Sequence, residues 1–209
     1  MSARNTVLLG YSGHAYVASD CLLPEFRASA YLDTEQKEKN PKELEYLGSE
    51  STVDIDRIRS LGPVFPAVGS NSLREKFVQW IRQNKLEEIQ AVHPTASVSS
   101  SAKVGQSTLI GPNAIVNAIA VLGDGVIVNS GSIVEHECVV EDYVHLAPGC
   151  AIAGNVTVKK GAFLGANVTV KEGITIGKYA IVGAGSVVLE DIPDNELWAG
   201  VPAEMKRIL

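Results

Sequence analysis

Residues 127–146 read IVNSGSIVEHECVVEDYVHL, and in this segment an aliphatic residue returns at every sixth position. The same spacing extends without interruption from Val92 to Val188. Four residues after each aliphatic position stands a small or β-branched residue, such as Ala96 or Thr108. A period of six matches neither the turn of an α-helix nor the heptads of a coiled coil. It is typical of a parallel β-helix, in which each hexad is one short strand with a turn and three hexads close one triangular coil.

Each hexad is expected to point its aliphatic side chain into the prism and its small side chain toward a tight corner. Val134 and Val140 are therefore predicted to be buried. Cys138 and Cys150 stand at the small inward position, which indicates core packing for both thiols. The remaining positions of each hexad are expected to face solvent or a partner.

Composition divides the 209 residues into two regions. Residues 1–90 carry most of the charge and the helix formers, whereas the repeat is rich in Gly, Val and Ala. We therefore predict a small Rossmann-like α/β domain over residues 1–90, a β-helix domain over residues 91–190 and a C-terminal tail over residues 191–209.

The overall charge and the cysteine content narrow the class of protein. A net charge of −6 argues against a nucleic-acid partner but permits anionic ligands at local sites. No apolar run is long enough for a membrane span, and the N-terminus lacks the pattern of a signal peptide. The 3 cysteines, an odd number, fit a reducing compartment. We expect a soluble, cytoplasmic protein with no membrane partner.

A glycine turn follows the first predicted strand. Residues 6–9 read as a buried strand, the segment GYSGH at 10–14 comes next, and residues 15–23 look helical until Pro24 ends the helix. Strand, glycine turn and helix in this order can cradle a phosphate, because glycines admit a close backbone approach and the helix N-terminus attracts negative charge. A plain tight turn remains the alternative. A second strand is expected to end at Asp33, which could bind a ribose or sugar hydroxyl or be an ordinary acidic loop residue.

The rest of the first region has weaker signals. Residues 34–46 are charged and predict a solvated loop with a short helix. Residues 64–68 read as a third strand, and residues 72–84 as a helix that begins with a capping box of Ser72 and Glu75. Phe77, Val78 and Ile81 supply the apolar face of that helix.

Two histidines of the repeat are candidates for chemistry. His136 occupies an outward position between Glu135 and Glu137, and His145 lies nine residues later. A neutral histidine beside a carboxylate is the usual general base near neutral pH, although an exposed surface histidine is the simpler interpretation. Nine residues are half a circuit of an 18-residue coil, so the two imidazoles could approach each other only across a subunit boundary, as in a homotrimer. The histidine spacing does not predict a metal site.

Several short motifs occur in a fixed order along the chain. They are the GYSGH turn at 10–14, VN at 128–129, VEHEC at 134–138, His145, AGNV at 153–156 and GVPA at 200–203. Together they resemble the NeuD/PglD-type sugar acyltransferases over essentially the whole chain. The resemblance implies a left-handed parallel β-helix of hexapeptide repeats, a homotrimer, and acetyl-CoA bound between neighbouring prisms.

The resemblance also implies roles for individual positions. His136 is similar to the catalytic base of the family, with Glu137 or Glu135 orienting it. Asn129 resembles an acceptor contact and His145 the histidine near the thioester. The positions that resemble contacts of the pantetheine arm are Gly154, Ala166 and Ala184, and those that resemble the nucleotide-sugar site are Gly10, Ser12, Gly13, His14 and Asp33. Tyr16 and Thr34 depart from the family pattern on the acceptor side and leave the nucleotide base open.

The function that the resemblance implies is acetyl-CoA-dependent N-acetylation of a 4-amino-deoxysugar linked to a nucleotide. The same scaffold could acetylate a hydroxyl group, as the sialic-acid branch of the family does. A trimer that only binds nucleotide sugars is the alternative outside the enzyme class, and the Glu135-His136-Glu137 cluster argues against it.

Overall fold

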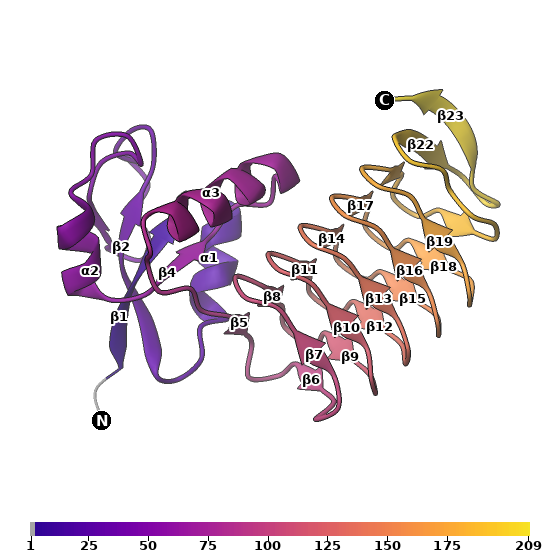
Figure 1. Ribbon diagram of the computed structural model, residues 1–209, viewed down its shortest axis with the longest axis horizontal. Coiled ribbons are helices and arrows are strands. Elements are labelled where there is room, and N and C mark those ends of the chain that lie inside the picture. Colours follow the sequence, from indigo (N-terminus) through magenta and orange to yellow (C-terminus); the bar gives the residue numbers. More distant parts are fainter. Residues whose placement is uncertain (1–2) are drawn as a thin grey trace.

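The computed structural model describes residues 3–209, and Figure 1 shows an α/β domain followed by a long prism of stacked coils. The α/β domain is built on a 4-stranded parallel sheet in the order β3-β2-β1-β4. Its strands are β1 (Arg4–Leu9), β2 (Phe26–Leu32), β3 (Glu45–Tyr46) and β4 (Val64–Pro66), and its helices are α1 (Gly13–Asp20), α2 (Ile55–Leu61) and α3 (Asn71–Gln83).

Two local expectations for this domain are wrong. The loop over residues 34–46 contains the short strand β3 and no helix, because two tyrosine hydroxyls hold its backbone. Lys37 N donates to Oη of Tyr31 in β2 at 2.9 Å, and Lys42 N donates to Oη of Tyr11 in the glycine turn at 3.3 Å. The N-cap of α3 is Ser70 rather than Ser72, since Ser70 Oγ accepts from Leu73 N. The helix α2 was not predicted.

The prism has the three sheets that the hexad pattern predicts. The 8-stranded sheet contains β5, β8, β11, β14, β17, β20, β22 and β23, the 6-stranded sheet contains β6, β9, β12, β15, β18 and β21, and the 5-stranded sheet contains β7, β10, β13, β16 and β19. Their bounds are β5 (Ala91–Val92), β6 (Ser97–Val98), β7 (Lys103–Val104), β8 (Leu109–Ile110), β9 (Ile115–Val116), β10 (Val121–Leu122), β11 (Ile127–Val128), β12 (Ile133–Val134), β13 (Val139–Val140), β14 (His145–Leu146), β15 (Ala151–Ile152), β16 (Thr157–Val158), β17 (Phe163–Leu164), β18 (Thr169–Val170), β19 (Thr175–Ile176), β20 (Ile181–Val182), β21 (Val187–Val188), β22 (Glu196–Ala199) and β23 (Glu204–Ile208).

The coils stack in parallel, with each residue opposite the one 18 positions later, as for Val128 and Leu146. Every aliphatic position of the repeat from Ile110 to Val188 is buried, and so are Cys138 and Cys150. Val98, in the first coil, is 36% exposed because no coil precedes it. The prediction of a Rossmann-like domain followed by a left-handed parallel β-helix is confirmed.

The corners of the prism have their own period of six. From Ser107 to Gly185, the residue before each small inward position has a positive φ, with values near 60° at Asn113, Glu137 and Tyr143. This left-handed conformation is uncommon for residues other than glycine. It lets the chain turn sharply between sheets and return the next aliphatic residue to the core.

The α/β domain packs on one side of the prism. Outward side chains of the 8-stranded sheet, Ala91, Leu109 and Ile127, form one apolar cluster with residues of the α/β domain such as Leu8 and Tyr11. At the far end of the same sheet, the last residues form the hairpin β22–β23 (Figure 1). We propose that the chain divides into residues 1–90, 91–190 and 191–209. The helices among residues 3–209 are too short or too polar to cross a lipid bilayer.

Candidate active site

His136 lies on the turn from β12 to β13, at an exposed corner of the prism. The next residue, Glu137, has a φ of 61°, and its carboxylate approaches the ring so that His136 Nδ1 is 3.0 Å from Glu137 Oε2. A carboxylate at neutral pH only accepts hydrogen bonds, so Nδ1 carries the proton and the lone pair of the neutral ring lies on Nε2. Glu137 therefore fixes the tautomer that a general base requires.

The neighbours of His136 explain two further predicted positions. Gly154 lies in the next coil beneath the ring, where a Cβ atom would come within 2.6 Å of His136 Cε1. A larger residue there would displace the imidazole from its present position. Glu135 Oε2 accepts from the backbone N of His136 at 3.4 Å, so its carboxylate contacts the backbone of the histidine and Glu137 contacts the ring.

His145 lies at the junction of the two domains and is buried. Its Nδ1 lies 3.1 Å from the carbonyl oxygen of Gly69, and its Nε2 lies 3.2 Å from Nδ2 of Asn129. Burial, helped by the positive charge of Arg74, lowers the pKa of His145 to about 4. The ring is therefore neutral near pH 7, and the chain itself occupies both of its nitrogens.

His14 lies beside His145, with ring centroids 6.1 Å apart. Its Nε2 is buried and has no hydrogen-bond partner within residues 3–209. Burial and the charge of Arg74 lower the pKa of His14 to about 4. The sequence did not predict that these two histidines would be neighbours, because they are 131 positions apart and belong to different domains.

The glycine turn lies at the carboxyl end of β1, where parallel sheets bind ligands. Gly10 has a φ of 87°, and a Cβ atom there would collide with the side chain of Val68. Ser12 is the N-cap of α1, and its exposed hydroxyl makes no capping hydrogen bond. A cleft of about 220 Å³ opens here, lined in part by Gly10, Ser12 and Asp33. Gly13 follows as the first residue of α1 and is exposed.

Asp33 holds the loops around this cleft together. Its Oδ2 accepts from Tyr11 N at 3.0 Å, and its Oδ1 lies 3.1 Å from Lys37 Nζ and 2.8 Å from Thr34 N. Although partial burial opposes the shift, these hydrogen bonds lower the pKa of Asp33. One lone pair of Oδ2 remains that could accept from a ligand hydroxyl.

Single chains do not bring all the predicted residues together. The corner with His136 joins the 6- and 5-stranded sheets and so lies opposite the 8-stranded sheet, where the α/β domain packs. Ala166 and Ala184 lie at a different edge, on the turns that follow β17 and β20. His136 and His145 thus face different sides of the prism, as the half-circuit spacing predicts.

Comparisons with known proteins agree with this architecture. The family described as the PglD N-terminal domain matches residues 5–81, and the one described as the GMPPB C-terminal domain matches residues 86–196. A solved histidine-to-asparagine mutant of perosamine N-acetyltransferase from Caulobacter crescentus, in complex with CoA and GDP-perosamine, is 34% identical to this chain. The similarity covers 97% of both chains, with a TM-score of 0.92. The chain belongs to the NeuD/PglD-type family of sugar acyltransferases.

Other members of this acyltransferase family are similar as well. The acetyltransferase domain of PglB from Neisseria gonorrhoeae, solved in complex with acetyl coenzyme A, is 28% identical over 98% of this chain and 100% of that domain, with a TM-score of 0.89. UDP-N-acetylbacillosamine N-acetyltransferase from Bacillus subtilis is 36% identical over 112 residues. That match spans 51% of this chain and 51% of the relative.

Two residues of this acyltransferase were missed by the sequence analysis. Gly69 supplies the carbonyl that holds His145, and Arg74 is buried between the domains. Arg74 precedes Phe77, Val78 and Ile81 at helical spacing, so its place on the buried face of the helix could have been inferred. The role of Gly69 had no sequence signal, since it depends on how the domains pack. The described residues contain no group of His, Cys, Asp and Glu side chains that could hold a metal ion.

Proposed function

We propose that this chain transfers the acetyl group of acetyl-CoA to the 4-amino group of a nucleotide-linked deoxysugar, with His136 as the general base. The observation that carries the proposal is the His136–Glu137 pair, held in one tautomer above Gly154. Relatives solved with CoA and GDP-perosamine, or with acetyl coenzyme A, support the donor and the class of acceptor. Both named enzymes among these relatives are N-acetyltransferases, which favours an amine over a hydroxyl.

The reaction follows from the geometry of the pair. His136 Nε2 takes a proton as the amine nitrogen attacks the thioester carbon, and the carboxylate of Glu137 stabilises the imidazolium that forms. The backbone N–H of Gly154 stabilises the oxyanion of the tetrahedral intermediate, because the N–H groups of Ala153 and Asn155 donate to carbonyls of the chain. When the intermediate collapses, the C–S bond breaks, the amide forms, and the imidazolium returns its proton to the leaving thiolate of CoA.

The acceptor cleft and the base come from different subunits of a homotrimer in this proposal. The cleft lined in part by Gly10, Ser12 and Asp33 belongs to the α/β domain, as do Gly13 and His14, whereas His136 lies at the opposite corner of the same prism. A three-fold arrangement of parallel prisms can place the corner of one chain against the domain of the next. Asn129 would contact the acceptor sugar. The CoA arm would run past His145, Gly154, Ala166 and Ala184.

The expected location is the cytoplasm. Cys21, Cys138 and Cys150 are all free and buried, and free thiols are usual for a reducing compartment.

The direct test is release of free thiol from acetyl-CoA by the purified wild-type protein with a panel of acceptors. The panel contains GDP- and UDP-linked 4-amino-deoxysugars, their 4-hydroxy counterparts and sialic acid. We expect thiol release with a 4-amino sugar and a product that gains one acetyl group on nitrogen. Turnover of hydroxyl acceptors alone would show an O-acetyltransferase. Tight nucleotide-sugar binding with no turnover of any acceptor would show a binding protein instead.

A further inference from the structure

A buried arginine joins the two domains beside His145. Arg74, in the first turn of α3, is 1% exposed. Its guanidinium donates to Gly125 O and Tyr143 O on the prism, and to Gly69 O in the α/β domain. All its acceptors are carbonyl or amide oxygens, and within residues 3–209 no carboxylate pairs with it. Burial lowers the pKa of Arg74 to about 9. Burying a charge without an opposite charge costs free energy. A residue that only links the two domains would not need such a buried charge.

The carbonyl of Gly69 links Arg74 to His145. Gly69 O accepts from Arg74 Nη1 at 3.2 Å and lies 3.1 Å from His145 Nδ1. Because a carbonyl oxygen can only accept, His145 Nδ1 carries the hydrogen and Nε2 of the neutral ring is an acceptor.

The next link is the side-chain amide of Asn129. Its Oδ1 accepts from Ser130 N at 2.8 Å, which places Nδ2 toward His145 Nε2 at 3.2 Å. A protonated ring would bring a second donor against this amide, so the network admits only the neutral ring. Asn129 Nδ2 has two hydrogens, and one of them remains for a ligand.

We infer that Arg74 is a positioning residue for the acceptor: through Gly69 O and His145 it fixes the amide of Asn129 so that one N–H is free for the sugar. This inference rests on the proposed function, in which Asn129 contacts the acceptor. The charge of Arg74 acts in the same direction, because together with burial it keeps the neighbouring rings of His14 and His145 neutral.

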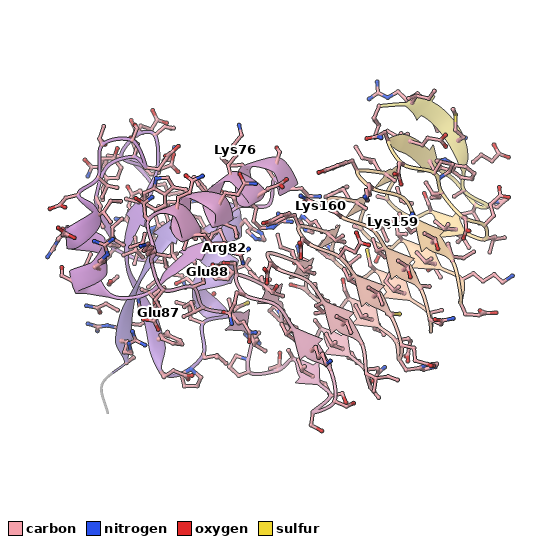
Figure 2. The ribbon with its side chains drawn as sticks, viewed as in Figure 1. Lys76, Arg82, Glu87, Glu88, Lys159 and Lys160 are labelled. Atoms are coloured by element: carbon pink, nitrogen blue, oxygen red, sulfur yellow. The ribbon has the colours of Figure 1, made fainter. Side chains whose placement is uncertain are left out.

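Arg82 is a matched control on the same helix. It lies farther along α3 and also ties that helix to the prism, through Asp124 at 2.6 Å, and it pairs with Glu88 at 2.7 Å. Figure 2 shows Arg82 beside Glu88 where α3 meets the first coils. These ion pairs are partly exposed, and none of their members forms a hydrogen bond or ion pair with Gly69, His145 or Asn129.

The first test is a double-mutant cycle on kcat/KM for the acceptor. Arg74→Met should lower kcat/KM by roughly ten- to thirtyfold, whereas in an Asn129→Ala background it should lower it by no more than about twofold, because the link is already lost. Arg82→Met should stay within about twofold of the wild type. If the double variant lost kcat/KM by the product of the two single losses, Arg74 would act only on the packing of the domains. An equal loss of kcat/KM in Arg82→Met would show the same.

The second test needs no acetyl transfer. Nitrogen-15 NMR of labelled histidine side chains should show His145 as the single Nδ1–H tautomer in the wild type and as a mixture or a protonated ring in Arg74→Met. If Arg74→Met does not fold, Arg74→Lys keeps the charge but loses the planar fork of donors, and should still change the tautomer signal. An unchanged His145 signal in the folded variant overturns the inference. Absence of turnover by the wild type overturns the proposed function instead.

Discussion

At the scale of residues, two histidines of one prism have opposite chemistry because their surroundings differ. His136 is exposed, has a carboxylate at Nδ1 and presents a free Nε2. His145 is buried, and both its nitrogens are bound to the protein. Sequence position alone made both of them candidates, and the contacts distinguish an exposed ring with a free Nε2, which we propose as the base, from a buried ring with both nitrogens bound.

Replacing His136 tests the base directly. His136→Ala should lower kcat by roughly 10²–10⁴, the usual effect of losing a general base, and leave acetyl-CoA affinity nearly intact. Steady-state kinetics and calorimetric titration with acetyl-CoA measure the two quantities. Near-native kcat would remove His136 from the mechanism.

A substitution of Glu137 should affect catalysis and stability differently. Its φ of 61° is unfavourable for a residue with a side chain, so Glu137→Gly should relieve strain of about 1 kcal/mol and leave the melting temperature unchanged or raised. The same change removes the partner of His136 Nδ1 and should lower kcat by roughly tenfold. A variant with full kcat would mean that the carboxylate does not orient the ring.

At the scale of elements, the hexad pattern predicts the prism because the same core contacts recur in every coil along one axis. The aliphatic positions of the hexad repeat from Ile110 onward are buried as predicted. Local signals were weaker in the α/β domain. The capping box at Ser72 and Glu75 was wrong, because Glu75 pairs with Lys160 of the prism at 2.8 Å and Ser70 caps the helix. Contacts between domains decide such details, and a local pattern does not contain them.

The register of the prism predicts a large effect of one core substitution. Val140 is fully buried, so Val140→Asp would place an unpaired charge in a narrow core and cost about 3–5 kcal/mol. Chemical denaturation of Val140→Asp and of the exposed neighbour change Val139→Asp compares the two faces of one strand. Equal stability of the two variants would contradict the register.

At the scale of the whole molecule, neutral histidines at the domain junction tie stability to pH. His14 and His145 have a folded pKa of about 4, below the value of 6.5 expected when unfolded. The unfolded chain therefore binds more protons between these values, and stability falls as the pH drops through this window. From about pH 7.5 to about pH 5 the loss should be about 2 kcal/mol per imidazole.

Urea denaturation at the two pH values measures this effect. His145→Gln should show about half of the wild-type pH dependence, whatever its stability at neutral pH. Asp33 and Glu87 have lowered pKa values, so they contribute to the pH dependence of stability only under more acidic conditions. A midpoint independent of pH between about 7.5 and 5 would mean that the two rings become protonated in the folded protein.

The central claim is that one chain supplies the base and the next supplies the acceptor cleft, and mixed trimers test it. His136→Ala removes the base, and Ser12→Trp fills the cleft of about 220 Å³ without touching the prism. Each cyclic trimer that contains both variants has one interface where an intact His136 meets an intact cleft. Two inactive proteins, unfolded and refolded together in equal amounts, should therefore recover about a quarter of the wild-type rate. Activity no greater than that of the separate variants would contradict the shared site.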